Sequence, residues 1–185
     1  MSTIRIALVD DSFHTRRSVH ELLGYCKDME VVQVCDSGMG FLAYLKKTKD
    51  QSPPDIVLMD IDMPELDGID TVSIAKSVCP EIKFLMLTMY DDEDLLFRAI
   101  KAGASGFLLK DEKINIVEKH IRNLYEGIDA PMSPSIAKKA LLLIHKSKRE
   151  EAQPQDGSLP VPLEVSSREI EVLQLLVEGY NYKDI

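Results

Sequence analysis

The fold is decided by the stretch Asp55-Ile56-Val57-Leu58-Met59-Asp60, a short apolar run that ends on an acidic residue. Four further apolar runs occur in the first 110 residues, and helical patterns separate them. Short, continuously apolar runs of this kind are typical of buried parallel strands in an α/β sheet. The predicted strands are Ile4 to Val9, Val31 to Cys35, Asp55 to Met59, Lys83 to Leu87 and Gly106 to Leu109.

Each predicted strand is followed by apolar residues at helical spacing. Side chains at positions i, i+3 and i+4 share one face of a helix, so each set predicts a helix that packs on the sheet. The five stripes are Val19/Leu22/Leu23, Phe41/Leu42/Leu45, Ile69/Val72/Ala75, Leu95/Leu96/Ile100 and Ile114/Val117/Ile121/Leu124. The acidic run from Asp91 to Asp94 opens the fourth helix, and Gly127 ends the fifth. This alternation predicts an α/β fold, a (βα)5 doubly wound parallel sheet.

Four of the five apolar runs end on residues that handle phosphate or metal. In open α/β sheets, ligands bind in the crevice beyond the carboxyl ends of the strands. The sequence therefore predicts that three carboxylates, a hydroxyl and an ammonium group converge on one site. These residues are Asp10, Asp11, Asp60, Thr88 and Lys110, whereas the remaining run ends on Asp36, which fits no obvious chemistry.

The predicted cluster suits phosphoryl chemistry. An aspartate can attack phosphorus and form an acyl phosphate. The incoming group is strongly anionic, so it needs a divalent cation beside the carboxylates, and Mg²⁺ takes oxygen ligands of this kind. Lys110 can pair with the phosphoryl oxygens, and Thr88 can donate a hydrogen bond to one of them.

Each of these residues also has a plain structural explanation. A single aspartate after a strand is usually the N-cap of the next helix, and a single lysine is usually a solvated surface residue. Phe107, in the last apolar run, is by default a core residue. The combination of three carboxylates with Thr88 and Lys110 favours the functional interpretation.

Composition and charge limit the class of protein. The net charge is −9, and residues 1–130 carry 15 Lys and Arg against 23 Asp and Glu, so this part is unsuited to gripping nucleic acid by itself. Three cysteines without a CxxC motif predict reduced thiols. No charged-then-apolar leader and no long apolar stretch occurs, which predicts a cytoplasmic protein with no membrane partner.

The pattern changes after Gly127. Ser133-Pro134 predicts the start of a helix at about 134–146, with basic residues from Lys138 to Arg149 that suit a solvated face. Residues 150–163 contain three prolines and a glycine without periodicity, which predicts an extended linker. The capping box from Ser166 to Glu169 predicts one more helix, which ends at Gly179.

These motifs together resemble the receiver domain of two-component response regulators, and the NarL/FixJ subfamily in particular. The resemblance rests on Asp10-Asp11, Asp60 to Gly68, Thr88 and Ala102 to Asp111, and it runs from residue 4 to about 127. Over a shorter stretch, residues 166–185 resemble the beginning of the LuxR-type helix-turn-helix output domain of that subfamily. The predicted parts are a receiver domain at 1–128, a linker at 129–163 and an N-terminal fragment of the output domain at 164–185.

The resemblance implies a flavodoxin-like fold with strand order 2-1-3-4-5 and a role for each motif residue. Asp60 is the expected phosphoacceptor for a sensor histidine kinase, with Thr88 and Lys110 as the other catalytic residues. Thr88 and Phe107 match the family's switch pair, although phenylalanine lacks the hydroxyl group of the tyrosine found in other members. Phosphorylation is expected to bias pairing into a homodimer.

The resemblance also implies a metal site. Mg²⁺ or Mn²⁺ is the expected cofactor, with Asp11, Asp60 and the backbone carbonyl of Asp62 as ligands. Asp10 is expected to contribute through water. Lys110 is followed by Asp111 rather than by the proline common in other receivers.

Transcription control is the implied output, but the part of the output domain that reads DNA lies beyond Ile185. In helix-turn-helix proteins the second helix enters the major groove and reads the bases. The chain is therefore expected to lack sequence-specific DNA affinity, and promoter DNA is a partner only of the complete protein.

Two alternatives come from other classes of protein. Haloacid dehalogenase phosphatases also use an aspartate, Mg²⁺, Thr or Ser and Lys, and Asp60-Ile61-Asp62 superficially fits their DxD motif. Those enzymes place that motif after the first strand, the opposite order to this chain, so we do not expect a turnover enzyme. The other alternative is a receiver that works only as an adaptor or interaction module.

Overall fold

The computed structural model describes residues 3–48, 52–89, 92–128, 132, 137 and 138. Within residues 3–128 of this described part, five strands and five helices alternate, as the sequence predicts. The strands are β1 (Ile4–Val9), β2 (Met29–Cys35), β3 (Ile56–Asp60), β4 (Lys83–Thr88) and β5 (Gly106–Leu109). The helices are α1 (Phe13–Leu23), α2 (Gly38–Lys47), α3 (Gly68–Val78), α4 (Glu93–Lys101) and α5 (Ile114–Glu126).

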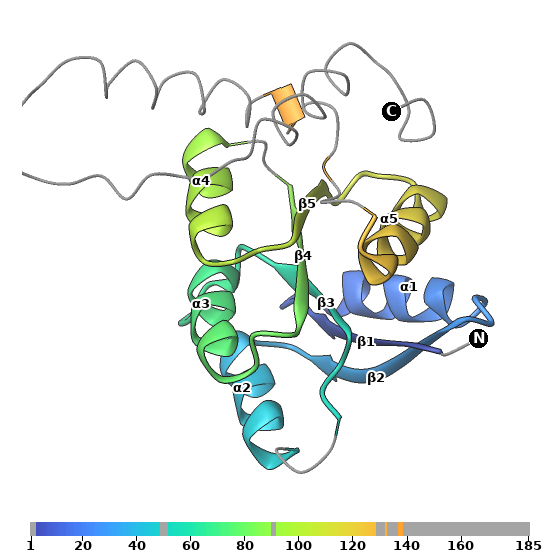
Figure 1. Cartoon of the computed structure of the whole chain (residues 1–185), viewed down its shortest axis with the longest axis horizontal. Helices are drawn as coiled ribbons and strands as arrows, with labels where there is room; N and C mark the ends of the chain where they lie inside the picture. The colour runs from blue at the N-terminus through green and yellow to red at the C-terminus, as the bar shows by residue number, and fades with distance from the viewer. Residues whose placement is uncertain (1–2, 49–51, 90–91, 129–131, 133–136, 139–185) are drawn as a thin grey trace, which may run out of the picture.

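The strands form one parallel sheet in the order β2-β1-β3-β4-β5, which confirms the expected strand order. Helices α1 and α5 lie on one side of the sheet, and α2, α3 and α4 lie on the other (Figure 1). Successive strand residues point to opposite faces. In β3, Ile56 and Leu58 accordingly pack in the core under α1 and α5, whereas Val57 and Met59 pack in the core under α2, α3 and α4.

Strand ends depend on pairing as well as on apolar content. β1 and β5 have the predicted bounds, but β2 begins at Met29 because Met29 and Glu30 pair with Ile4 and Arg5. β3 and β4 include their polar end residues, since Asp60 pairs with Leu87 and Thr88 pairs with Leu109. The polar residues that we predicted to follow these strands are therefore part of the sheet.

Helices α1 to α4 begin at polar caps, and the helices cover the sheet mostly as predicted. In the acidic run, Asp92 is the N-cap of α4 and accepts hydrogen bonds from the amides of Asp94 and Leu95. Gly127 ends α5 with a φ of 72°, a left-handed conformation that glycine adopts without strain. One predicted core position is wrong: Leu22 is 39% exposed, and Leu23 alone of that pair is buried.

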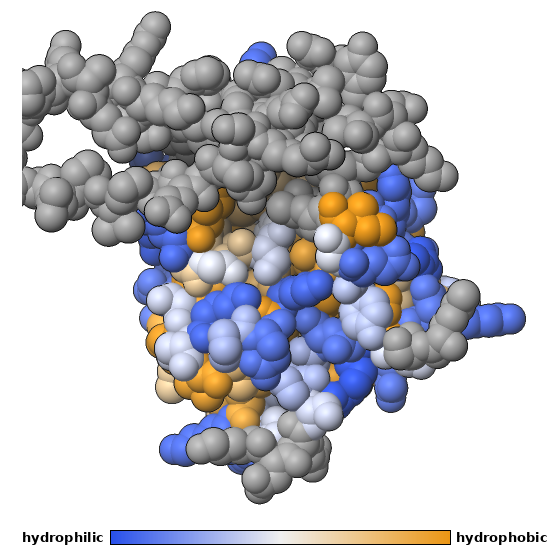
Figure 2. Space-filling model, viewed as in Figure 1, coloured by the Kyte–Doolittle hydropathy of each residue, from blue (hydrophilic) through white to orange (hydrophobic). Residues whose placement is uncertain are grey.

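The helix predicted at about 134–146, the linker at 129–163 and the helix-turn-helix fragment at 164–185 lie outside the described residues, apart from Met132, Ala137 and Lys138. None of the described helices is both long and apolar enough to cross a membrane. Hydrophilic residues alternate with small hydrophobic patches on the face seen in Figure 2, including the region of α2 and α3. Exposed apolar side chains of α2 and α3 include Met39, Ile74 and Val78.

Candidate phosphorylation site

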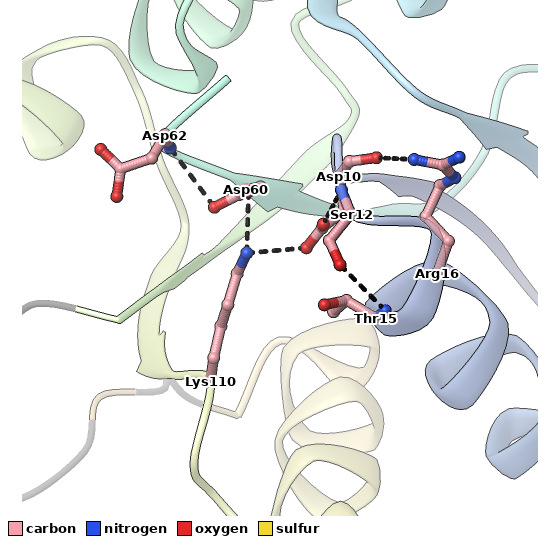
Figure 3. Close-up of polar contacts among 7 residues, drawn as sticks. All are labelled: Asp10, Ser12, Thr15, Arg16, Asp60, Asp62 and Lys110. Carbon is pink, nitrogen blue, oxygen red and sulfur yellow. Dashed lines mark hydrogen bonds and ion pairs between the residues drawn. The ribbon is translucent and has the colours of Figure 1, made fainter. Parts of the chain in front are cut away.

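Three predicted site residues meet at the carboxyl ends of β1, β3 and β5. Lys110 Nζ lies 2.8 Å from Asp10 Oδ2 and 2.8 Å from Asp60 Oδ2, so one ammonium group bridges two carboxylates (Figure 3). Both carboxylates are buried, and the Lys110 side chain is only 13% exposed. The sheet thus brings together residues that are 50 positions apart in the sequence, as predicted.

The backbone at the start of α1 holds Asp10. Asp10 Oδ1 accepts a hydrogen bond from the Ser12 amide at 2.8 Å, and Ser12 is itself the N-cap of α1. The Arg16 guanidinium, one turn later, donates to the Asp10 carbonyl oxygen at 2.6 Å (Figure 3). Sequence reasoning missed Ser12 and Arg16 as neighbours of the site, although a serine directly after two strand-end aspartates is a capping signal.

The charges in this cluster do not balance. Burial raises the pKa of Asp60 to about 6, and although Lys110 opposes this change, the neighbouring Asp10 carboxylate adds to it. Burial lowers the pKa of Lys110, but its hydrogen bonds to Asp10 and Asp60 outweigh that effect and hold the pKa above its ordinary value. Two buried carboxylates that share one ammonium leave an excess of negative charge, which favours a further cation at the site.

The third acidic residue, Asp11, is exposed at the mouth of the site. Each of Asp10, Asp11 and Asp60 offers a carboxylate oxygen, and these oxygens all lie within 4.8 Å of one another. Oxygen ligands at such spacing fit a hard divalent cation such as Mg²⁺. The Asp62 amide donates to Asp60 Oδ1 at 3.3 Å, while the Asp62 carboxylate points away from Lys110 (Figure 3).

A tight turn fixes the loop between β3 and α3. The Gly68 amide donates to the Ile61 carbonyl oxygen at 2.9 Å, which folds the loop back on the end of β3. A Cβ atom at Gly68 would lie 1.9 Å from the Asp60 carbonyl oxygen, so only glycine fits. Asp67 caps α3 through the Asp70 amide at 2.7 Å and also forms an ion pair with Arg98 of α4 at 3.0 Å.

The predicted switch residues lie on neighbouring strands. Thr88 ends β4 and is fully buried, and Phe107 lies in β5 with 1% of its surface exposed. Phe107 pairs with Met86, and Thr88 pairs with Leu109. The expected core position of Phe107 is therefore confirmed, and its side chain belongs to the core under α2, α3 and α4.

A parallel (βα)5 sheet with buried acidic residues and a lysine at its carboxyl edge defines the class of phosphoacceptor signalling domains. The family of the response regulator receiver domain matches residues 6–122, and the chain belongs to this family.

Curated relatives extend the similarity beyond the receiver domain. The oxygen regulatory protein NreC of Staphylococcus epidermidis (strain ATCC 12228 / FDA PCI 1200) is 33% identical over 187 residues, which cover 98% of this chain and 81% of that protein. NreC of Staphylococcus aureus (strain MRSA252) is 35% identical over 188 residues, with the same coverage.

Solved structures agree with the fold. A LuxR-family two-component response regulator from Aurantimonas sp. SI85-9A1 is 26% identical with a TM-score of 0.68, and the match covers 82% of this chain and all of that one. The response regulator ChrA of a heme-sensing two-component system is 29% identical with a TM-score of 0.61, covering 98% of this chain and 78% of that one. The chain is thus a phosphorylation-activated two-component response regulator that controls transcription.

Proposed function

We propose that Asp60 is the residue that accepts the phosphoryl group from a sensor histidine kinase. The observation that carries this proposal is the Lys110 ammonium, which lies 2.8 Å from both Asp60 and Asp10 at the carboxyl edge of the sheet. Asp60 stands at the end of the central strand β3, between the acidic end of β1 and Thr88 at the end of β4.

The reaction forms one bond and breaks one. A carboxylate oxygen of Asp60 attacks phosphorus, the bond from phosphorus to the kinase imidazole nitrogen breaks, and the imidazole leaves with that electron pair. Lys110 stays beside the acyl phosphate and offsets the charge of its oxygens, and Thr88 donates a hydrogen bond to one of them. Because Asp60 must be ionised to attack, its raised pKa makes the reaction slow in acid and faster toward neutral pH.

The acidic cluster supports a divalent cation as cofactor. We assign Asp11, Asp60 and the Asp62 backbone carbonyl as ligands of Mg²⁺ or Mn²⁺, with Asp10 acting through water. A bound ion would supply positive charge that offsets these carboxylates and the phosphoryl oxygens. The oxygen-only donor set and the excess negative charge at the site support this assignment.

Thr88 and Phe107 transmit the effect of phosphorylation from the site to the surface of the receiver. Thr88 moves toward the phosphoryl group, Phe107 turns into the space it leaves, and the changed surface biases two chains toward a homodimer. Residues 129–163 link the receiver to a LuxR-type domain that begins at about residue 164, and through this output domain the protein binds promoter DNA in the cytoplasm. The similarity to NreC over 98% of the chain supports an output part beyond the receiver. The protein assists its own phosphorylation and dephosphorylation and is not a turnover enzyme.

Labelling by a small phosphodonor tests the proposal. We expect acetyl phosphate with Mg²⁺ to add one hydroxylamine-labile phosphoryl group to the parent chain, measured by intact mass, and none to Asp60→Asn. Asp62→Asn is the matched control, because its exposed carboxylate has no assigned role, and it should label normally. If Asp60→Asn is labelled as strongly as the parent, Asp60 is not the phosphoacceptor. Steady turnover of a phosphomonoester would identify the protein as a phosphatase instead.

A further inference from the structure

The outer edge of β5 pairs with a residue that follows α5 in the sequence. On one side β5 pairs with β4, where Phe107 lies opposite Met86. On its other side Phe107 forms a parallel bridge with Met132, one of the three residues after Ile128 that the structure describes. The edge of a sheet presents unpaired N–H and C=O groups that readily accept another segment. Here Met132 of the same chain occupies that edge at the predicted switch residue.

A glycine closes the end of α5, five residues before Met132. Gly127 takes the left-handed conformation, and the amides of Gly127 and Ile128 donate to the carbonyl oxygens of Leu124 and Asn123 at 3.2 and 3.0 Å. This pattern closes a helix and reverses the chain. The bridge between Phe107 and Met132 is parallel, so at Met132 the backbone runs in the same direction as β5.

Side chains reinforce the bridge. Met132 is partly buried and packs against the core cluster that contains Phe107, Leu96 and Ala99. Ala137, five residues further on, is fully buried. Methionine has a flexible thioether side chain that fits irregular gaps and adapts when its neighbours move. Met132 therefore combines a backbone link to β5 with an apolar anchor in the core beside α4.

We propose that Met132 docks the chain that follows α5 onto the edge of β5, and that movement of Phe107 releases it. This inference rests on the proposed function, in which Phe107 moves when Asp60 is phosphorylated. Phe107 is 1% exposed in a closely packed core, so its ring cannot turn without displacing a neighbour. Met86 lies in β4, which pairs with a strand on each side, whereas Met132 lies at the outer edge of the sheet and is partly buried, so we expect Met132 to be the neighbour that moves.

Amide hydrogen exchange tests the docking step without any phosphodonor. In Met132→Ala, the peptide that covers Gly106–Leu109 should exchange about three- to tenfold faster than in the parent, as expected when edge contacts are lost. Met132→Leu keeps the apolar anchor and should match the parent. Met39→Ala removes a methionine that is 56% exposed on α2 and should also match it. Unchanged exchange in Met132→Ala, or faster exchange that includes β1 as well, overturns the docking.

Beryllofluoride with Mg²⁺, a stand-in for the phosphoryl group, tests the release step. Exchange in Gly106–Leu109 should become at least about threefold faster in the parent, and it should change much less in Met132→Ala, whose edge is already free. An equal response in both proteins refutes the coupling to Phe107. Intact mass after acetyl phosphate treatment separates the two proposals: an unlabelled parent refutes the proposed function, whereas the docking result does not depend on phosphorylation.

Discussion

At the scale of single residues, the site is defined by an imbalance of charge. Lys110 bridges Asp10 and Asp60, and the exposed Asp11 adds a third carboxylate nearby. Residues that suit a reaction often reduce the stability of the folded state, because burial of like charges costs free energy. The raised pKa of Asp60 is a measurable consequence of this loss of stability.

The first prediction concerns pH. Below the ordinary pKa of 3.8, Asp60 is protonated in both the folded and the unfolded chain, so its raised pKa does not change the free energy of unfolding. As the pH rises from 3.8 toward about 6, the unfolded chain loses this proton first, and folding therefore becomes less favourable. Without metal ions and with a chelator, Asp60→Asn should therefore be more stable than the parent by about 1–3 kcal/mol at pH 7.5. Denaturant unfolding should show this gap closing toward pH 4. A gap that stays constant with pH contradicts the raised pKa.

The backbone next to Asp60 leaves no room for a side chain at position 68. Gly68→Ala places a Cβ atom 1.9 Å from the Asp60 carbonyl oxygen, a backbone atom that cannot move away without shifting β3. We expect a loss of about 2–4 kcal/mol in the free energy of unfolding, as found for severe overpacking, together with slower labelling of Asp60.

Gly40→Ala is the matched control for Gly68→Ala. Its Cβ atom would lie 3.1 Å from the Ser37 hydroxyl oxygen, a side-chain atom that needs to shift by only a few tenths of an ångström while it stays the cap of α2. Because alanine also favours the helix, the net change should stay within about 1 kcal/mol. Equal effects of the two substitutions in denaturant unfolding would mean that the close approach at Asp60 is not the cause.

At the scale of elements, polar caps fix where most helices begin relative to the strands. Ser12, Ser37, Asp67 and Asp92 each accept a hydrogen bond from an amide in the first turn of their helix. Helix α5 has no side-chain cap of this kind at its start, and it is held instead at its end. Lys83 Nζ, at the start of β4, donates to the carbonyl oxygens of Leu124 and Tyr125 at 2.6 and 3.2 Å.

Lys83→Met should weaken the attachment of α5. The last carbonyl groups of a helix have no partner within the helix, and an ammonium group that binds them also offsets the helix dipole. We expect a loss of about 1–2 kcal/mol in the free energy of unfolding and faster amide exchange in the last turn of α5. Lys27→Met changes an exposed lysine and should have little effect. If both variants unfold like the parent, the Lys83 contacts do not stabilise α5.

At the scale of the whole molecule, the site gathers residues from three strands, so a ligand bound there stabilises the whole sheet. Mg²⁺ or Mn²⁺ at millimolar concentration should raise the melting temperature by about 3–8 °C, because the ion binds the folded chain and not the unfolded one. Asp11→Ala should lose most of this shift. Asp62→Ala should keep it, since only the backbone carbonyl of Asp62 is an assigned ligand. An Asp11→Ala melting curve that responds to metal like the parent rules out the cluster as the metal site.

The sequence by itself determined the class of fold and predicted which carboxylates and which lysine come together. Periodicity and strand-end chemistry are local properties, so the apolar runs, the helical stripes and the cluster of Asp10, Asp60 and Lys110 could be predicted from short segments. The strand order came from the family resemblance, and the structure confirms it. Strand bounds were correct where the apolar run and the pairing coincide, as in β1 and β5. The predictions for β2 and β4 were short, because pairing extends β2 to Met29 and β4 to Thr88. The prediction for β3 was shifted by one residue, since the strand begins at Ile56 rather than Asp55 and includes Asp60.

Only the tertiary structure decided which groups touch. The bridge from Lys110 to two carboxylates, the approach of Gly68 to the Asp60 carbonyl oxygen and the pairing of Met132 with Phe107 each join segments that local pattern does not relate. Leu22 shows the converse, because its helical spacing predicts burial and the placement of α1 leaves it exposed. The physical reason is the same in each case: spacing along the chain selects a face of an element, but the packing of elements against one another decides what that face meets.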